Sequence, residues 1–198
     1  MILSTSLITL LVAGRVLASA SSGLVRRTCG LGPSRIDVLN VTAPDQPSST
    51  YSQFTLTRDG NPVSNTQVVA MTFDLIPSSA TGCRLQITIP PLIEPNQIAW
   101  GSSTQAEFWT TDPWYPNTPP TWNNLPAKRE MVGTFGFPTY VTNSVFQTNL
   151  ASNVCSDPMS YLILLSDWQT QPGGVNFINS LGGKQGLEVL GFEMIFDC

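Results

Sequence analysis

Six aromatic side chains lie between residues 100 and 129, and their types suit contact with a sugar. Tryptophan and tyrosine rings combine an apolar face with a polar edge, so they can stack on a sugar ring and hydrogen-bond beside it. The predicted ligand-binding residues are Trp109, Trp114, Tyr115 and Trp122. We favour the other interpretation of these rings, in which the tryptophans fasten this proline-rich stretch to the protein core.

Glu107 is the carboxylate whose sequence neighbours best suit acid–base chemistry. Phe108 and Trp109 follow it and could exclude water from a general acid. Glycoside hydrolysis needs two carboxyls and no histidine, but the sequence marks no second carboxylate as a partner. We therefore expect no catalytic residues, and a histidine-free glycoside hydrolase is the least favoured alternative.

Histidine is absent from all 198 residues. Its absence excludes Ser-His-Asp and Cys-His catalysis as well as histidine-ligated zinc or copper. The acidic residues lack the D-x-D-x-D-G spacing of a calcium loop, and the cysteines form no C-x-x-C pair. We expect neither a metal nor a cofactor.

The first 27 residues have the order of a secretory leader. An apolar run over residues 2–12 is too short to span a membrane and is followed by Ala18-Ser19-Ala20, which fits the A-x-A cleavage rule. We predict a signal peptide over residues 1–20, cut after Ala20. Residues 21–27 read as a propeptide ending in a dibasic site, Arg26-Arg27, which leaves a domain over 28–198. The predicted location is extracellular.

Charge excludes further classes of partner. Nine basic against thirteen acidic residues give a net charge of −4. Because residues 1–27 hold three arginines and no acid, residues 28–198 carry −7. An acidic chain without a basic patch argues against nucleic acid and anionic membranes. Acidic residues also interrupt the apolar end of the chain, so we expect no glycolipid anchor.

Four cysteines are widely spaced: Cys29, Cys83, Cys155 and Cys198. An even number after a leader predicts two disulfides, which could pair in three ways. We favour Cys29–Cys198, which would tie the two ends of the domain, and Cys83–Cys155, which would join two strand ends.

Asn40-Val41-Thr42 is an N-glycosylation sequon. In a secreted chain we expect Asn40 to lie at the surface and to carry a glycan.

Alternating apolar and polar residues predict many strands. The clearest sets are 69–75, 85–89 and 190–196, and the continuously apolar run 161–165 suits a strand buried on both faces. Weaker candidates are 53–57, 131–137, 144–148 and 175–178. Turn residues separate these runs, and no helical periodicity of useful length occurs. We predict an all-β fold, an antiparallel β-sandwich of jelly-roll type.

Residues 100–129 also hold five prolines, which cannot pair within a central strand. We expect a long, ordered Trp/Pro-rich loop laid over a face or an edge of a sheet.

Several motifs together resemble the fungal secreted domains of the ubiquitin-3-binding-protein C-terminal domain family. They are Phe73-Asp74-Leu75-Ile76-Pro77, then Gly82-Cys83-Arg84-Leu85, then Val175-Asn176-Phe177 and the terminal Cys198. The resemblance implies a β-rich extracellular domain without established catalytic residues. The family name suggests a ubiquitin-pathway partner, but a leader peptide argues for an extracellular one.

We therefore expect a non-enzymatic, extracellular or wall-associated protein with an interaction role. Its expected partner is a cell-wall polysaccharide or an extracellular protein. A carbohydrate-binding module that uses the aromatic loop is the alternative.

Overall fold

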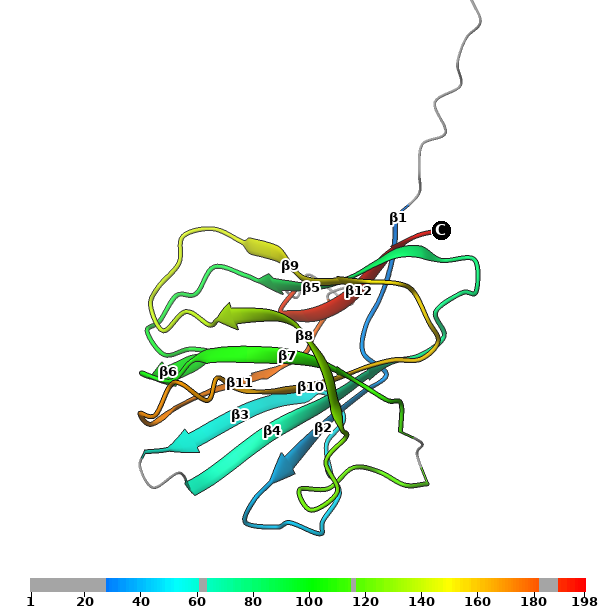
Figure 1. Ribbon diagram of the computed structural model, residues 1–198. Coiled ribbons are helices and arrows are strands. Elements are labelled where there is room, and N and C mark those ends of the chain that lie inside the picture. The colour runs from blue at the N-terminus through cyan, green and yellow to red at the C-terminus, as the bar shows by residue number, and fades with distance from the viewer. Residues whose placement is uncertain (1–27, 61–63, 115–116, 182–188) are drawn as a thin grey trace, which may run out of the picture.

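Two antiparallel sheets pack face to face in the computed structural model (Figure 1), which describes residues 28–60, 64–114, 117–181 and 189–198. These residues form no helix. The predicted all-β sandwich is therefore confirmed. No helix in the described ranges is long and apolar enough to cross a membrane. The predicted leader over 1–20 with Ala20, and the segment 21–27 with Arg26 and Arg27, lie outside the described residues.

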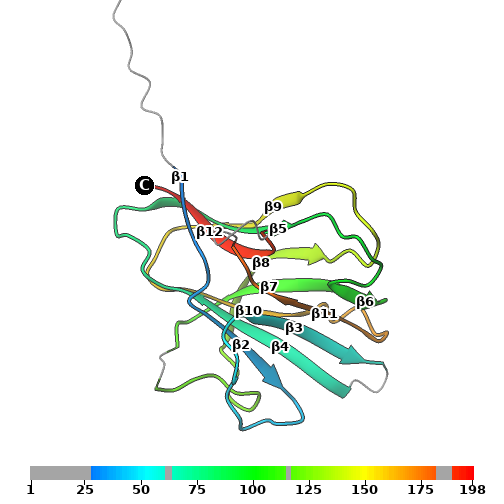
Figure 2. The same cartoon turned by 180° about the vertical axis from the view of Figure 1, so that it is seen from behind.

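The smaller sheet has four strands and carries the start of β1 and the end of the chain side by side (Figures 1 and 2). Its order is β1 (Thr28–Leu31), β12 (Gly191–Asp197), β5 (Thr81–Ile89) and β9 (Phe146–Asn153).

The larger sheet is curled and contains the other strands of the described chain. Its path is β6 (Ala99–Gly101), β11 (Gly173–Ile178), β3 (Gln53–Asp59), β4 (Ser64–Phe73), β10 (Met159–Leu165), β7 (Gln105–Thr111) and β8 (Lys128–Gly136), and β2 (Arg35–Asn40) also pairs with β4.

The main core lies between the sheets. On β5 the apolar set Leu85, Ile87 and Ile89 is buried, and the intervening side chains are half-buried, as the period-2 pattern predicts. Phe54 of the large sheet meets Phe192 of the small sheet, with their ring centroids 4.8 Å apart. Aromatic rings thus fill much of the space between the layers.

A second, smaller core lies on the other face of β4 and β10. It consists of Leu39, Val68, Ala70 and Leu162, and Trp114 and Trp122 of the proline-rich loop pack against it. Tyr161 and Ile163 belong to the main core, so β10 is covered on both faces. This second layer explains why residues 161–165 are continuously apolar, and it confirms that prediction.

The proline-rich loop is shorter than expected. Trp100 lies in β6 and Trp109 lies in β7, so the loop covers 112–127, of which 115–116 are not described. Asn123 fastens it to the connection between β2 and β3, since its N–H donates to Pro44 O at 3.0 Å and its Nδ2 donates to Asp45 Oδ1 at 2.8 Å.

β4 ends two residues earlier than its pattern predicted. Alternation placed Leu75 on the buried face, but it is 83% exposed and has a φ of 65°. A positive φ is incompatible with an extended strand, so pairing stops at Phe73. β1, β2, β6 and β7 were not predicted as strands, because each lacks a long alternating run.

Arg58 holds the larger sheet together where β4 changes partners. β3 pairs with the start of β4, and β10 pairs with its later part. The buried Arg58 guanidinium donates to Leu165 O at 3.0 Å, to Ser166 O at 2.8 Å and to Gln169 O. It therefore satisfies carbonyl groups at the end of β10 and in the segment after it.

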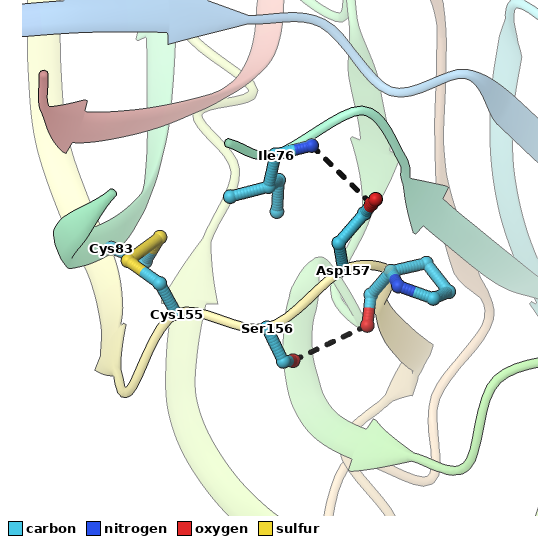
Figure 3. The surroundings of a disulfide bond; sticks show 6 residues. Ile76, Cys83, Cys155, Ser156 and Asp157 are labelled. Atoms are coloured by element: carbon cyan, nitrogen blue, oxygen red, sulfur yellow. Dashed lines mark hydrogen bonds between the residues drawn. A yellow bond between two sulfur atoms is a disulfide. The ribbon is translucent and has the colours of Figure 1, made fainter. Parts of the chain in front are cut away.

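Both favoured disulfides are present. Cys29–Cys198 joins β1 to the residue after β12, with Cα atoms 5.9 Å apart. Cys83–Cys155 joins β5 to the segment after β9, with Cα atoms 5.1 Å apart. Figure 3 shows that this segment also meets the chain after β4, where Ile76 N–H donates to Asp157 Oδ1 at 3.3 Å. The bridges thus hold both ends of the described chain and one end of the sandwich.

Candidate functional site

The predicted aromatic residues do not form one exposed platform. Trp114 and Trp122 are partly buried against the second core, as the structural alternative expected. Trp109 lies on β7, where its Nε1–H donates to Glu107 Oε2 at 3.0 Å and Lys128 Nζ lies 4.8 Å from its ring centroid. Tyr115 lies outside the described residues. Trp114 and Trp122 are therefore engaged in packing against the second core, and Trp109 is engaged in local polar contacts.

A different tryptophan borders an open groove. Trp100 on β6 remains 40% exposed, and its strand pairs with β11 so that Trp100 lies opposite Gly174. A Cβ on Gly174 would come within 2.8 Å of Trp100 Cη2, which shows that the indole packs onto the backbone of β11. Glycine at this position allows the ring to lie against the sheet, with part of its surface facing solvent.

The groove has a volume of about 550 Å³, which is within the usual range for small-molecule sites. Its walls come from β2, β3, β4, β6 and β11 and from the connection between β2 and β3. The lining side chains are amides, hydroxyls, small apolar groups and one tryptophan: Val38, Asn40, Ala43, Gln46, Pro47, Ser48, Ser49, Thr50, Gln53, Thr55, Thr57, Gln67, Trp100 and Asn176.

The floor of the groove follows from strand periodicity. On β3, Phe54 and Leu56 point into the main core, so the residues between and beside them point the other way. These are Gln53, Thr55 and Thr57, which all line the groove. A half-buried strand with polar side chains on its open face thus supplies a row of hydrogen-bonding groups.

Asn176 is held by two residues of β3. Thr55 lies directly opposite it, and both Thr55 Oγ1 and Gln53 Nε2 donate to Asn176 Oδ1 at 3.0 Å. No hydrogen bond within the described ranges uses Asn176 Nδ2. Because an amide nitrogen carries two donors, Asn176 can present them to a ligand from a fixed position.

At the other end of the floor, Gln67 of β4 lies between β2 and β3. It lies opposite Thr57 on β3 and opposite Asn40 on β2, and Thr57 Oγ1 donates to Gln67 Oε1 at 3.2 Å. The residues after β2 return towards β3 as a wall, in which Ser48 Oγ donates to Thr50 O at 2.7 Å. The groove is therefore built of side chains whose positions are set by neighbouring hydrogen bonds.

None of the lining residues within the described chain is charged. The ion pairs lie elsewhere. Asp112 and Arg129 pair beside the proline-rich loop, and the hydrogen bond from Arg129 lowers the pKa of the Asp112 carboxyl. Glu107 does not line the groove either. In the described ranges, no group of three or more histidine, cysteine, aspartate or glutamate residues is placed to hold a metal ion.

A second groove of about 490 Å³ differs in character. Glu130 and Asp157 line it, and the buried Tyr161 hydroxyl in its wall has no hydrogen-bond partner within the described chain. Burial raises the pKa of Tyr161 far above its ordinary value, so the phenol stays protonated at neutral pH. Among the described residues that line this groove there is no tryptophan, which makes the groove beside Trp100 the better candidate for a sugar.

The groove has no continuous signature in the sequence, because its residues come from five strands and from the connection between β2 and β3. One local signal was available, since Gln53, Thr55 and Thr57 alternate with Phe54 and Leu56. That pattern indicates a polar strand face but does not say what lies beside it. Gly173-Gly174 reads as a turn, whereas both glycines lie in β11.

No protein-family model matches this chain, and no curated protein sequence matches it. The resemblance based on residues 73–77 and 82–85 therefore stays a prediction.

Proposed function

We propose that this protein is a non-enzymatic extracellular protein that binds an uncharged saccharide in the groove beside Trp100. One observation carries the proposal, namely the composition of the groove. It combines an exposed tryptophan with amides and hydroxyls and has no charged side chain among the described residues that line it.

This composition matches the chemistry of a neutral sugar. Sugar hydroxyls both donate and accept hydrogen bonds, and so do the amides and hydroxyls on the floor. The apolar face of a sugar ring can stack on the exposed part of the Trp100 indole. A charged ligand would find no counter-ion here and would lose hydration without compensation. A neutral polysaccharide, such as a wall polymer, therefore fits better than an acidic one.

The extracellular setting is supported by the two disulfides, since such bonds persist in oxidising compartments. The predicted leader over residues 1–20 points the same way. Binding without catalysis is supported by the groove itself, since glycoside hydrolysis needs a pair of carboxyl groups and none of its described lining residues carries one.

A second candidate function is contact with an extracellular protein, which exposed apolar side chains on and beside two linked loops favour. Exposed Ile93 lies on one loop, exposed Tyr140 and Val145 lie on another, and exposed Phe146 begins β9 directly after it. The loops are tied together, since Thr142 N–H donates to Leu92 O at 3.0 Å. Exposed apolar patches often mark protein contacts.

The test is a calorimetric titration of the secreted protein with neutral β-glucan and chitin oligosaccharides. Trp100→Ala should weaken binding about tenfold, which corresponds to ~1.4 kcal/mol for a lost stacking contact. Trp168→Ala is the matched control, because Trp168 is 67% exposed and does not line the groove. An acidic oligogalacturonide should not bind.

Two results would overturn the proposal. One is the absence of binding to every neutral oligosaccharide. The other is unchanged binding in Trp100→Ala, which would place the sugar elsewhere on the surface.

A further inference from the structure

The sequon lies in a tight turn at the end of β2. Asn40 is the last residue of the strand, and Ala43 N–H donates to Asn40 O at 3.1 Å, which closes the turn. Within it, the N–H and the Oγ1 of Thr42 both donate to Asn40 Oδ1 at 2.9 Å, and both bonds are exposed. This is an Asx-turn, in which the side-chain oxygen takes the place of a backbone carbonyl.

Because these two bonds use only the side-chain oxygen of Asn40, its amide nitrogen Nδ2 remains available for modification. No hydrogen bond within the described chain uses Asn40 Nδ2, whereas Asn40 Oδ1 accepts two. The turn thus presents Nδ2 in a form that an enzyme could modify. Asn40 is half-buried and Thr42 is exposed, so the sequon lies at the surface and has the threonine at its third position that an N-glycosylation acceptor requires.

Asn40 also belongs to the wall of the groove. It lines the same cavity as Trp100 and Asn176, and it lies opposite Gln67, which accepts from Thr57 on the floor. A sugar attached to Asn40 Nδ2 therefore begins at the edge of a groove whose described lining suits neutral, hydroxyl-rich groups.

We propose that Asn40 carries an N-linked glycan whose first sugars occupy this groove and compete with a ligand from outside. The second part rests on the proposed function. In the attachment step, Asn40 Nδ2 attacks C1 of a lipid-linked oligosaccharide pyrophosphate. The N–C1 bond forms, the C1–O bond to the pyrophosphate breaks, the lipid pyrophosphate leaves, and Nδ2 loses one proton to a base of the transferase.

Because the glycan is attached to the protein beside the groove, it can occupy the groove even if its intrinsic affinity is weak. A group tethered by a short flexible linker has an effective concentration of roughly millimolar at a nearby site. A neutral glycan with millimolar intrinsic affinity would thus fill about half of the grooves without any external ligand. A free saccharide would have to displace this glycan, so glycosylation of Asn40 weakens the apparent affinity of the groove for free saccharide.

The test compares three chains secreted from a glycosylating host. Thr42→Ala removes the sequon without changing a residue that lines the groove, and Thr42→Ser is the matched control because serine preserves the sequon. Intact mass should show a glycan on the wild type and on Thr42→Ser but not on Thr42→Ala. Calorimetry with the neutral oligosaccharides should show about twofold tighter binding by Thr42→Ala alone, since a competitor that fills about half of the grooves raises the apparent Kd about twofold.

A direct readout separates this inference from the proposed function. Nuclear Overhauser contacts between glycan protons and the Trp100 indole should be present in the wild type without added ligand. If they are present and no form binds free sugar, the glycan does occupy the groove and the proposed function is wrong. An unmodified Asn40 would overturn the inference, and so would a glycan without these contacts and with equal binding by all three chains.

Discussion

The Trp100 indole packs directly onto Gly174, the residue opposite it on β11. A Cβ at Gly174 would come within 2.8 Å of Trp100 Cη2 and 2.7 Å of Leu56 O. The ring therefore lies against the sheet because the neighbouring strand has no side chain there. Its position is set before any ligand arrives, which lowers the entropic cost of binding.

Gly174→Ala should displace the indole and weaken binding of neutral oligosaccharides several-fold. It should also lower the free energy of unfolding by about 1–3 kcal/mol, because the backbone at Leu56 must move to admit a methyl group. Calorimetry and urea unfolding measure the two effects. Gly136→Ala is the matched control, since no atom lies within 4 Å of the Cβ position there. Equal behaviour of the two variants would contradict the packing described.

Arg58→Lys should lower the free energy of unfolding by about 2 kcal/mol. Lysine cannot reproduce a planar guanidinium that donates to Leu165 O and Ser166 O together, so buried carbonyls lose partners. Arg129→Lys is the control. Arg129 pairs with Asp112 at the surface, where the same replacement should leave stability almost unchanged, because water and salt screen exposed ion pairs. Denaturant unfolding measures both free energies of unfolding. Similar losses of stability in the two variants would contradict the role of the Arg58 guanidinium described here.

Removing the Cys83–Cys155 disulfide by a double change to alanine should lower stability by about 4 kcal/mol. The two residues are 72 positions apart, and a closed loop of this length restricts the unfolded chain strongly. The thermal midpoint should fall by roughly 10 °C. Calorimetric scans measure it, with the wild type in reducing agent as a reference that loses both bridges. A midpoint within two degrees of the wild type would contradict the expectation.

Glu193→Gln should stabilise the protein at neutral pH and have little effect near pH 3. Glu193 lies on β12 beside Gln86 of β5, and burial raises its pKa above the ordinary value of 4.5. A carboxyl with a raised pKa in the folded state binds more protons there than in the unfolded state. Its ionisation therefore costs stability as the pH rises through the ordinary carboxyl range.

The measurement is the difference in thermal midpoint between Glu193→Gln and the wild type from pH 3 to pH 7. The difference should grow with pH and then level off. A difference that does not change with pH would show that packing, and not ionisation, decides the effect.

The alternating runs of β5 and β12 predicted their strands well, because burial against one core demands apolar side chains at every second position. The run 161–165 predicted a strand covered on both faces for the same reason. β6 and β7 were less visible, since they fall within the stretch that its prolines marked as a loop. Local composition thus indicated most strands but misjudged where that loop begins.

The aromatic residues show most clearly what the sequence could not predict about the site. The sequence marked Trp109, Trp114 and Trp122 by their number and their proline neighbours. Burial decides what a tryptophan does, and burial depends on which strands lie beneath it. Trp114 and Trp122 cover the second core. Trp100, which the sequence did not single out as a binding residue, remains partly exposed in the groove.

The sequence by itself determined the fold class, the even number of cysteines that predicts two disulfides and the sequon at Asn40, because each depends on residue type, local periodicity or number. Only the tertiary structure decided that Asn40, Trp100 and Asn176 line one groove. They are far apart in the chain, and strand pairing through β3, β4 and β11 brings their elements together. The register of those pairs is a property of the whole sheet, which no local pattern specifies.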